Sequence, residues 1–289
     1  MKKHFRRALI VASALVFVVF APVSGAMAAV QRVVSMNLCT DQLLMLVADK
    51  TQIASLSHLA RDETLAVMSA RARNYPVNHG RAEEIYLSRP DLVLAGSYTQ
   101  FNSINMLRGL GISVEQFAPV RSLKDIPANL RRIGALVGRE ARAEALVAAF
   151  QSQLAEAQRT ERAENVPAAI YYANSYTAGQ GTLMDEVVGA ARLENIADRL
   201  SLTGTRSLPL ELLVMESPDV LVTARKTGHP PALAHEVLRH PALRRTIHRQ
   251  GEVAIHTKYT ICGLPFITRA IEMLTKAGDV VASQAGSRK

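Results

Sequence analysis

The chain contains no tryptophan, and aromatic residues make up only 5% of its 289 residues. Surfaces that stack on sugars or on successive nucleotide bases depend on such rings, so the composition argues against a carbohydrate-binding face and a nucleic-acid platform. The charge pattern agrees, because no block of five or more like charges occurs and the basic residues are spread along the chain. We therefore expect no nucleic-acid partner.

Signatures of catalysis are also missing. The chain has no nucleophile elbow, no Cys-x-x-Cys pair and no dinucleotide-binding glycine motif. The segment GQGT at 179–182 lacks the Gly-Lys-Ser/Thr ending of a phosphate loop, so we interpret it as a tight turn before a helix. In HEVLRH at 235–240 the histidines are five residues apart, which turns the second imidazole about 140° around a helix. We expect neither an enzyme nor a metal centre.

Cysteine is scarce, with Cys39 and Cys262 the two in the sequence. One bridge does not make a disulfide scaffold, so the fold must depend on a hydrophobic core. The chain is 48% hydrophobic and long enough for one large domain or two medium ones.

Residues 1–28 have the layout of a secretory signal peptide, with a basic start, a 13-residue apolar run at 8–20 and small residues up to Ala28. We predict cleavage before Ala29 and export to the periplasm. An uncleaved anchor is the alternative, but the apolar run is short for a membrane span. Cleavage removes four basic residues and lowers the formal net charge from +9 to +5.

After residue 28, short aliphatic runs alternate with helical segments, which predicts parallel α/β structure. The predicted strands lie within 32–37, 52–62, 91–96, 112–119, 168–176, 218–225 and 252–259. Strong helix formers without Gly or Pro fill 139–165, which predicts one helix of about six or seven turns. We expect two α/β lobes, at 29–138 and 166–289, joined by this helix.

One element occurs twice. GRAEEIYLSRPDLVLAG at 80–96 and LPLELLVMESPDVLVTA at 208–224 align without a gap, 128 residues apart. Three residues match in the two copies: Glu83 with Glu211, Pro90 with Pro218, and Asp91 with Asp219. A duplicated architecture is predicted, with one copy in each lobe. A glutamate in the first turn of a helix favours the helix dipole without any partner, so its position alone leaves its role open.

Ligands of parallel α/β lobes bind beyond the carboxyl ends of the strands. The residues there combine Tyr and Met with basic and small polar groups, which suits a large, partly apolar and partly anionic small molecule. Ordinary solvation of a loop is the simpler interpretation of each residue taken alone. The candidates are Met36, Asn37, Cys39, His58, Arg61, Ser97, Tyr98, Asn174, Tyr176, Arg225, Lys258 and Tyr259.

Taken in order, these motifs resemble the periplasmic substrate-binding proteins of ABC importers for ferric siderophores, haem and cobalamin. The resemblance covers the chain after residue 28. It depends on RVVSMN at 32–37, the two E-x6-P-D elements, and the segments 111–138 and 178–197. It implies two lobes with parallel central sheets joined by one backbone helix, and an iron chelate or corrinoid held between them. No intrinsic cofactor is implied, and the protein would be a monomer that serves a dimeric inner-membrane permease.

The resemblance also implies roles for particular residues. Glu83 and Glu211 would lie on the outer tips of the lobes and pair with arginines of the permease dimer. Cys39 and Cys262 would lie near the cleft as a disulfide, as free thiols or as contacts to a metal-bearing ligand, and the resemblance does not decide among these.

Two alternatives to this function remain at this stage. The first is a haem- or metal-binding protein of the same fold, using His58 or His256. The second is an exported α/β enzyme.

Overall fold

The structure is a computed structural model that describes residues 30–160, 162, 165–225, 240–241 and 251–286. The predicted signal peptide at 1–28 and most of HEVLRH lie outside these residues. Within the described part of the chain, no helix combines the length and the apolar character needed to cross a membrane.

The first lobe is built on a five-stranded, all-parallel sheet of order β3-β2-β1-β4-β5. Its strands are β1 (Val33–Ser35), β2 (Ile53–Ser57), β3 (Val77–Asn78), β4 (Leu92–Gly96) and β5 (Ser113–Phe117). Its helices are α1 (Leu38–Val47), α2 (Ser69–Ala72), α3 (Ala82–Leu87), α4 (Phe101–Gly109) and α5 (Asp125–Val137), with 3-10 turns η1 (Lys50–Gln52) and η2 (His58–Arg61).

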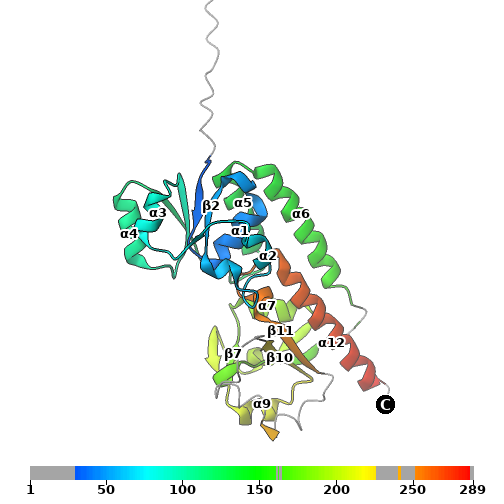
Figure 1. Cartoon of the computed structure of the whole chain (residues 1–289). Helices are drawn as coiled ribbons and strands as arrows, with labels where there is room; N and C mark the ends of the chain where they lie inside the picture. The colour runs from blue at the N-terminus through cyan, green and yellow to red at the C-terminus, as the bar shows by residue number, and fades with distance from the viewer. Residues whose placement is uncertain (1–29, 161, 163–164, 226–239, 242–250, 287–289) are drawn as a thin grey trace, which may run out of the picture.

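Helices cover both faces of this sheet, with α1 and α5 on one side and α3 and α4 on the other (Figure 1). Successive residues of a strand point to opposite faces, so Leu92 and Leu94 enter one core while Val93 enters the other. Burial on both faces explains why β4 is a continuous aliphatic run.

The second lobe has a four-stranded, all-parallel sheet of order β11-β10-β6-β8 and a small antiparallel pair, β7-β9. Its strands are β6 (Val166–Ile170), β7 (Tyr176–Ala178), β8 (Leu193–Asn195), β9 (Thr205–Ser207), β10 (Val220–Arg225) and β11 (Glu252–His256). Its helices are α7 (Leu183–Ala190), α8 (Ile196–Arg199), α9 (Leu210–Glu216), α11 (Thr257–Thr260) and α12 (Thr268–Gly286), with 3-10 turns η3 (Ala173–Ser175) and η5 (Pro265–Ile267). The strand predicted at 252–259 therefore stops at His256, because the next residues form α11.

The two lobes repeat one topology. β1 lies between β2 and β4 as β6 lies between β8 and β10, and the outer strands β5 and β11 occupy equivalent places. The matching hydrogen bonds are all 2.9 Å long: Asp91 N to Arg32 O, Asp219 N to Pro167 O, Met36 N to Leu94 O, and Tyr171 N to Val222 O. The prediction of two similar parallel lobes is confirmed.

The lobes are connected by α6 (Glu140–Ala157), which packs beside α12 (Figure 1). The helix predicted over 139–165 is thus too long, since it ends at Ala157. Thr275 Oγ1 of α12 donates to the carbonyl of Ala157 at 2.8 Å, and Thr160 Oγ1 then donates to Asp279 at 2.5 Å. Where α6 ends, the chain makes these contacts with α12. Helix propensity is a local property of the sequence and does not reveal contacts with a distant helix.

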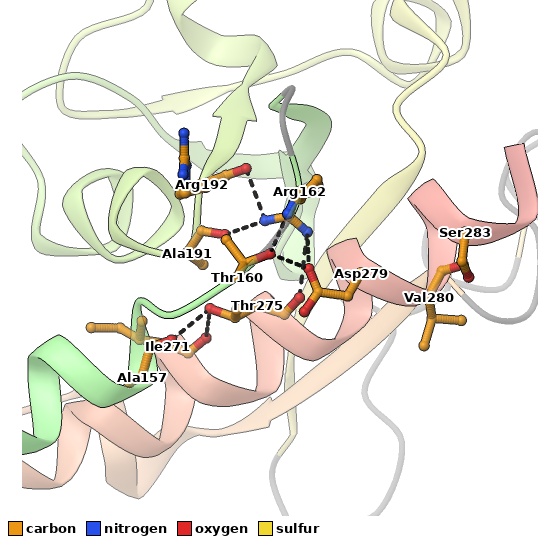
Figure 2. Close-up of polar contacts among 10 residues, drawn as sticks. All are labelled: Ala157, Thr160, Arg162, Ala191, Arg192, Ile271, Thr275, Asp279, Val280 and Ser283. Carbon is orange, nitrogen blue, oxygen red and sulfur yellow. Dashed lines mark hydrogen bonds and ion pairs between the residues drawn. The ribbon is translucent and has the colours of Figure 1, made fainter. Parts of the chain in front are cut away.

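Arg162, in the segment that follows α6, binds to the second lobe through hydrogen bonds and an ion pair (Figure 2). Its buried guanidinium donates through Nη2 to the carbonyls of Ala191 (2.6 Å) and Arg192 (3.0 Å), and Nη1 lies 3.2 Å from Asp279. Gly278 makes room for it, because a Cβ at that position would lie 1.8 Å from Nη1. The segment that follows α6 is therefore packed between the end of α7 and α12.

Candidate ligand-binding site

A cavity of about 220 Å³ lies where the two lobes meet. The first lobe contributes the ends of β1, β4 and β5 and the loops that follow them, while the second contributes Ile261 and Cys262. Four residues predicted from the strand ends line it: Asn37, Cys39, Ser97 and Tyr98. These four residues thus lie on the first-lobe side of the cavity, and their contact with a ligand stays a prediction.

Asn37 is held rigidly at the cavity wall. Its side chain accepts a hydrogen bond from Cys39 N at 2.9 Å, which caps the first turn of α1. Gly96 lets it lie against β4, because a Cβ on Gly96 would come 2.8 Å from Asn37 Nδ2. The amide is thus fixed before any ligand arrives.

A disulfide joins Cys39 to Cys262 across the two lobes, and both cysteines line the cavity. Their Cα atoms are 5.0 Å apart, and 223 residues separate them in the sequence. Of the three interpretations that the sequence left open, the structure has the bridge.

The lobes also touch beside this bridge. Gly263 packs closely on Val120, where a Cβ would lie 2.4 Å from Val120 Cβ, and Leu123 N donates to Glu186 Oε2 at 2.6 Å. The cavity therefore lies beside a direct contact between the lobes.

An exposed aromatic ring, that of Tyr98, lines the cavity on the first-lobe side. Tyr98 is 87% exposed, and Phe101, three residues further along the chain in the first turn of α4, is 73% exposed. Large rings left in water beside a cavity are typical of a surface that meets an apolar ligand. Sequence reasoning missed Phe117 and Ile261, which line the cavity. The position of Phe117 at the end of β5 was the available signal.

Several other predicted residues lie away from this cavity. Met36 is buried in the core under α3 and α4, so it does not face the space between the lobes. Arg61 Nη2 donates to Tyr75 O at 2.8 Å, and the His58 ring stacks on His79 with centroids 5.6 Å apart.

The candidate residues of the second lobe do not line this cavity, and they lie in different parts of that lobe. Asn174 is exposed in a left-handed conformation (φ 57°), and Tyr176 in β7 is half exposed. Lys258 Nζ and the Arg269 guanidinium each lie 5.7 Å from the centre of the Tyr259 ring. Arg225 ends β10, and its side chain lies outside the described part of the structure. Ligand contact by any of these residues stays a prediction.

A larger groove, of about 680 Å³, lies between α6 and α12 and is lined by residues such as Phe150 and Phe266. It is not at the carboxyl ends of strands, so we do not assign the ligand to it. Among the described residues, no group of three or more His, Cys, Asp or Glu is placed to hold a metal ion.

Asp41 is a buried carboxyl beside the cavity wall that sequence reasoning did not single out. It follows Thr40, which lines the cavity, and it accepts hydrogen bonds from Ser57 N (3.0 Å) and Ser57 Oγ (2.5 Å). Burial raises the pKa of Asp41 from 3.8 to about 7, although the bonds from Ser57 oppose this shift. The carboxyl joins α1 to the end of β2.

We expect Asp41 to make the free energy of unfolding depend on pH. The folded protein keeps the proton to a higher pH than the unfolded chain, so this stabilisation is complete below about pH 4 and is lost as the pH rises through 7. Relative to Asp41→Asn, the wild type should lose about 3 kcal/mol between pH 4 and pH 7. Urea unfolding of both proteins at several pH values measures the difference, and parallel pH profiles would contradict the prediction.

The two glutamates of the repeated element lie on helices of different lobes, Glu83 on α3 and Glu211 on α9 (Figure 1). Both are exposed, and among the described residues neither forms an ion pair or a hydrogen bond through its side chain. Their neighbours differ: Glu84 accepts from His79 N at 2.9 Å, and Glu216 lies 3.9 Å from Arg199 Nη1. Among the described residues, the two glutamates that occur in both copies are thus the ones without a side-chain hydrogen bond or ion pair.

Two similar α/β lobes around a shared cavity define a two-lobed ligand-binding protein. The chain belongs to the periplasmic binding protein family, whose model matches residues 33–248. This is a family of binding proteins and not of enzymes, as the sequence led us to expect.

The individual relatives and the solved structure described next share between 20% and 27% of their residues with this chain. A cobalamin-binding protein of Halobacterium salinarum is 26% identical over 254 residues, covering 86% of this chain and 69% of the relative. An ABC transporter substrate-binding lipoprotein of Bacillus subtilis is 27% identical over 151 residues, covering 49% of this chain and 48% of the relative. The structure of the periplasmic heme-binding protein RhuT from Roseiflexus sp. RS-1 has the same fold, with a TM-score of 0.69 at 20% identity over 88% of this chain and 99% of the other.

Proposed function

We propose that this protein captures an iron chelate or a corrinoid between its lobes and delivers it to an ABC importer. The observation that carries the proposal is the cavity between the lobes, with the exposed ring of Tyr98 on one side and the fixed amide of Asn37 in its wall. The relatives named for cobalamin binding and for an ABC transporter support the ligand class and the partner. In this proposal the protein is exported, is cleaved before Ala29, carries no cofactor of its own and acts as a monomer.

The size of the cavity favours a ligand that enters it in part. Its volume of about 220 Å³ is below the range of roughly 300–1,000 Å³ typical of pockets that enclose a drug-sized molecule. A chelate would therefore rest one apolar face on Tyr98 and Phe101. Lys258 and Arg269, which flank the Tyr259 ring in the second lobe, supply positive charge for its anionic groups.

A haem or a free metal ion is the second candidate ligand. The stacked rings of His58 and His79, at the ends of the adjacent strands β2 and β3, favour it because neutral imidazole is a common metal ligand. Loss of binding in His58→Ala and His79→Ala, but not in Tyr98→Ala, would support this candidate over a chelate held by the aromatic rings.

Titration of the purified protein with cyanocobalamin, haem, a panel of ferric siderophores and ferric iron alone tests the proposal. We expect saturable quenching of tyrosine fluorescence by one of the chelates. Tyr98→Ala should weaken that binding about tenfold, which corresponds to the contribution of one aromatic contact. Tyr86→Ala is the matched control, because Tyr86 is also exposed but lies on α3. An unchanged affinity in Tyr98→Ala would remove this cavity from the proposal, and absence of saturable binding would remove the ligand class.

A further inference from the structure

The disulfide between Cys39 and Cys262 lines the cavity where the lobes meet, which brings it within reach of a small molecule. The two cysteines are not equally covered, because Cys262 is 7% exposed whereas Cys39 is only partly buried. Exchange of a disulfide requires that a thiolate approach one of its sulfurs directly. The cavity provides this approach, and Cys39 is the less covered of the two cysteines.

A buried amide faces the sulfur of Cys262. Gln42 in α1 is completely buried, and its Oε1 accepts hydrogen bonds from Val67 N at 2.9 Å and Met68 N at 3.4 Å, which fixes the orientation of the amide. Its Nε2 then lies 3.8 Å from Cys262 Sγ. A disulfide sulfur is a weak acceptor, whereas hydrogen bonds to a charged group are the strong ones. The donor therefore suits a thiolate at Cys262 better than it suits the bridge.

The other cysteine lies at the positive end of a helix. Cys39 is the second residue of α1, a helix of ten residues whose N-cap is Asn37. The partial positive charge at the start of a helix stabilises a thiolate there. One helix thus favours negative charge at both sulfurs, at Cys39 through its N-terminus and at Cys262 through Gln42.

We infer that the bridge is a site of thiol–disulfide exchange, which a small dithiol reductant opens from the cavity while the protein stays folded. One thiolate of the reductant attacks Cys39 Sγ, the bond between the two cysteine sulfurs breaks, and Cys262 leaves as a thiolate that accepts from Gln42. The second thiolate of the reductant attacks the reductant sulfur bound to Cys39 and releases Cys39 as a thiolate. Two electrons pass to the bridge, the reductant becomes a disulfide, and its two thiol protons reach the cysteines through water.

Opening the bridge changes the wall of the cavity while the fold persists. The lobes still share one core, and Gly263 still packs on Val120 beside the bridge. Asn37 is held in the wall by Cys39 N, so the release of Cys39 loosens the amide that faces the cavity. The redox state of the bridge therefore sets how rigid the cavity is. This goes beyond the proposed function, because it holds for whichever ligand the cavity takes.

The first test follows reduction of the ligand-free protein by dithiothreitol, with the thiols counted by alkylation and mass spectrometry, in buffer and in urea that unfolds the chain. We expect the folded protein to be reduced at a rate proportional to the dithiothreitol concentration and within about tenfold of the rate of the unfolded chain. A rate in buffer that does not rise with dithiothreitol would show that the bridge opens only after the chain unfolds, and would overturn the inference.

The second test isolates the role of Gln42. Cys39→Ser leaves Cys262 as a single thiol facing Gln42, and the ultraviolet absorbance of the thiolate against pH measures its ionisation. Adding Gln42→Met, which keeps the length of the side chain but removes the donor, should lower the thiolate fraction at neutral pH about tenfold. With the bridge intact, Gln42→Met should slow reduction by dithiothreitol, whereas Gln153→Met, at an exposed position of α6, should not. An unchanged thiolate fraction and an unchanged rate of reduction would overturn the role of Gln42.

Amide hydrogen exchange of the oxidised and the reduced protein tests the consequence for the cavity. Reduction should speed exchange about tenfold in the first turn of α1 and in residues 261–264, while the strands of both sheets keep their protection. Equal exchange in the two redox states would contradict a bridge that sets the rigidity of the cavity. None of these measurements uses a ligand, so their failure would leave the proposed function intact.

Discussion

Replacing both Glu83 and Glu211 with alanine should reduce uptake through the importer to background while leaving ligand affinity unchanged. The two carboxylates are exposed, have no partner among the described residues and lie on separate lobes, so their removal alters neither the cavity nor the core. If the protein docks on a two-subunit permease as proposed, each single variant should have an intermediate effect, because one of the two contacts remains. Uptake of the ligand by cells that carry the intact importer is the measurement.

The same helices provide the control. Glu84→Ala and Glu216→Ala remove acidic residues that already interact within the protein, with His79 and Arg199 respectively. They should transport normally, although they change the net charge by the same amount. Normal uptake by the Glu83 and Glu211 double variant would remove the docking role.

The sequence was a good guide to the fold where signals are local and repeated. Strands buried on both faces produce aliphatic runs such as Leu92–Leu94, and the duplicated Pro-Asp step starts β4 and β10 with the same hydrogen bond. The end of α6 was not predictable in this way. Ala157 is where α12 supplies a hydroxyl donor, and that contact joins residues more than 100 positions apart.

The candidate site was predictable where it depends on topology. Asn37 and Ser97, chosen because they follow β1 and β4, both line the cavity, since all strands of the sheet point the same way. Their contact with a ligand stays a prediction. Met36 was a different case. Side chains alternate along a strand, so Met36 continues the inward face of Val34 and packs in the same core.

The bridge between Cys39 and Cys262 was beyond prediction for a physical reason. A disulfide needs Cα atoms within about 7 Å, and sequence does not give a distance across two lobes. Its loop of 223 residues is long, and loop-closure entropy grows with loop length. The bridge therefore restricts the unfolded chain strongly.

Replacing both cysteines, as Cys39→Ser with Cys262→Ser, should lower the free energy of unfolding by about 5 kcal/mol. Urea unfolding of wild type and variant measures this, and a reductant should shift the wild type toward the variant while leaving the variant unchanged. Ligand affinity should fall far less, because one continuous core runs through both lobes from Val33 to Leu274 and holds them together. An equal stability of the two proteins would contradict the prediction and would mean that this shared core, together with the packing of α6 on α12, already fixes the lobes without the bridge. The covalent link and the common core both oppose separation of the lobes, which fits the proposed capture of a ligand by a preformed site.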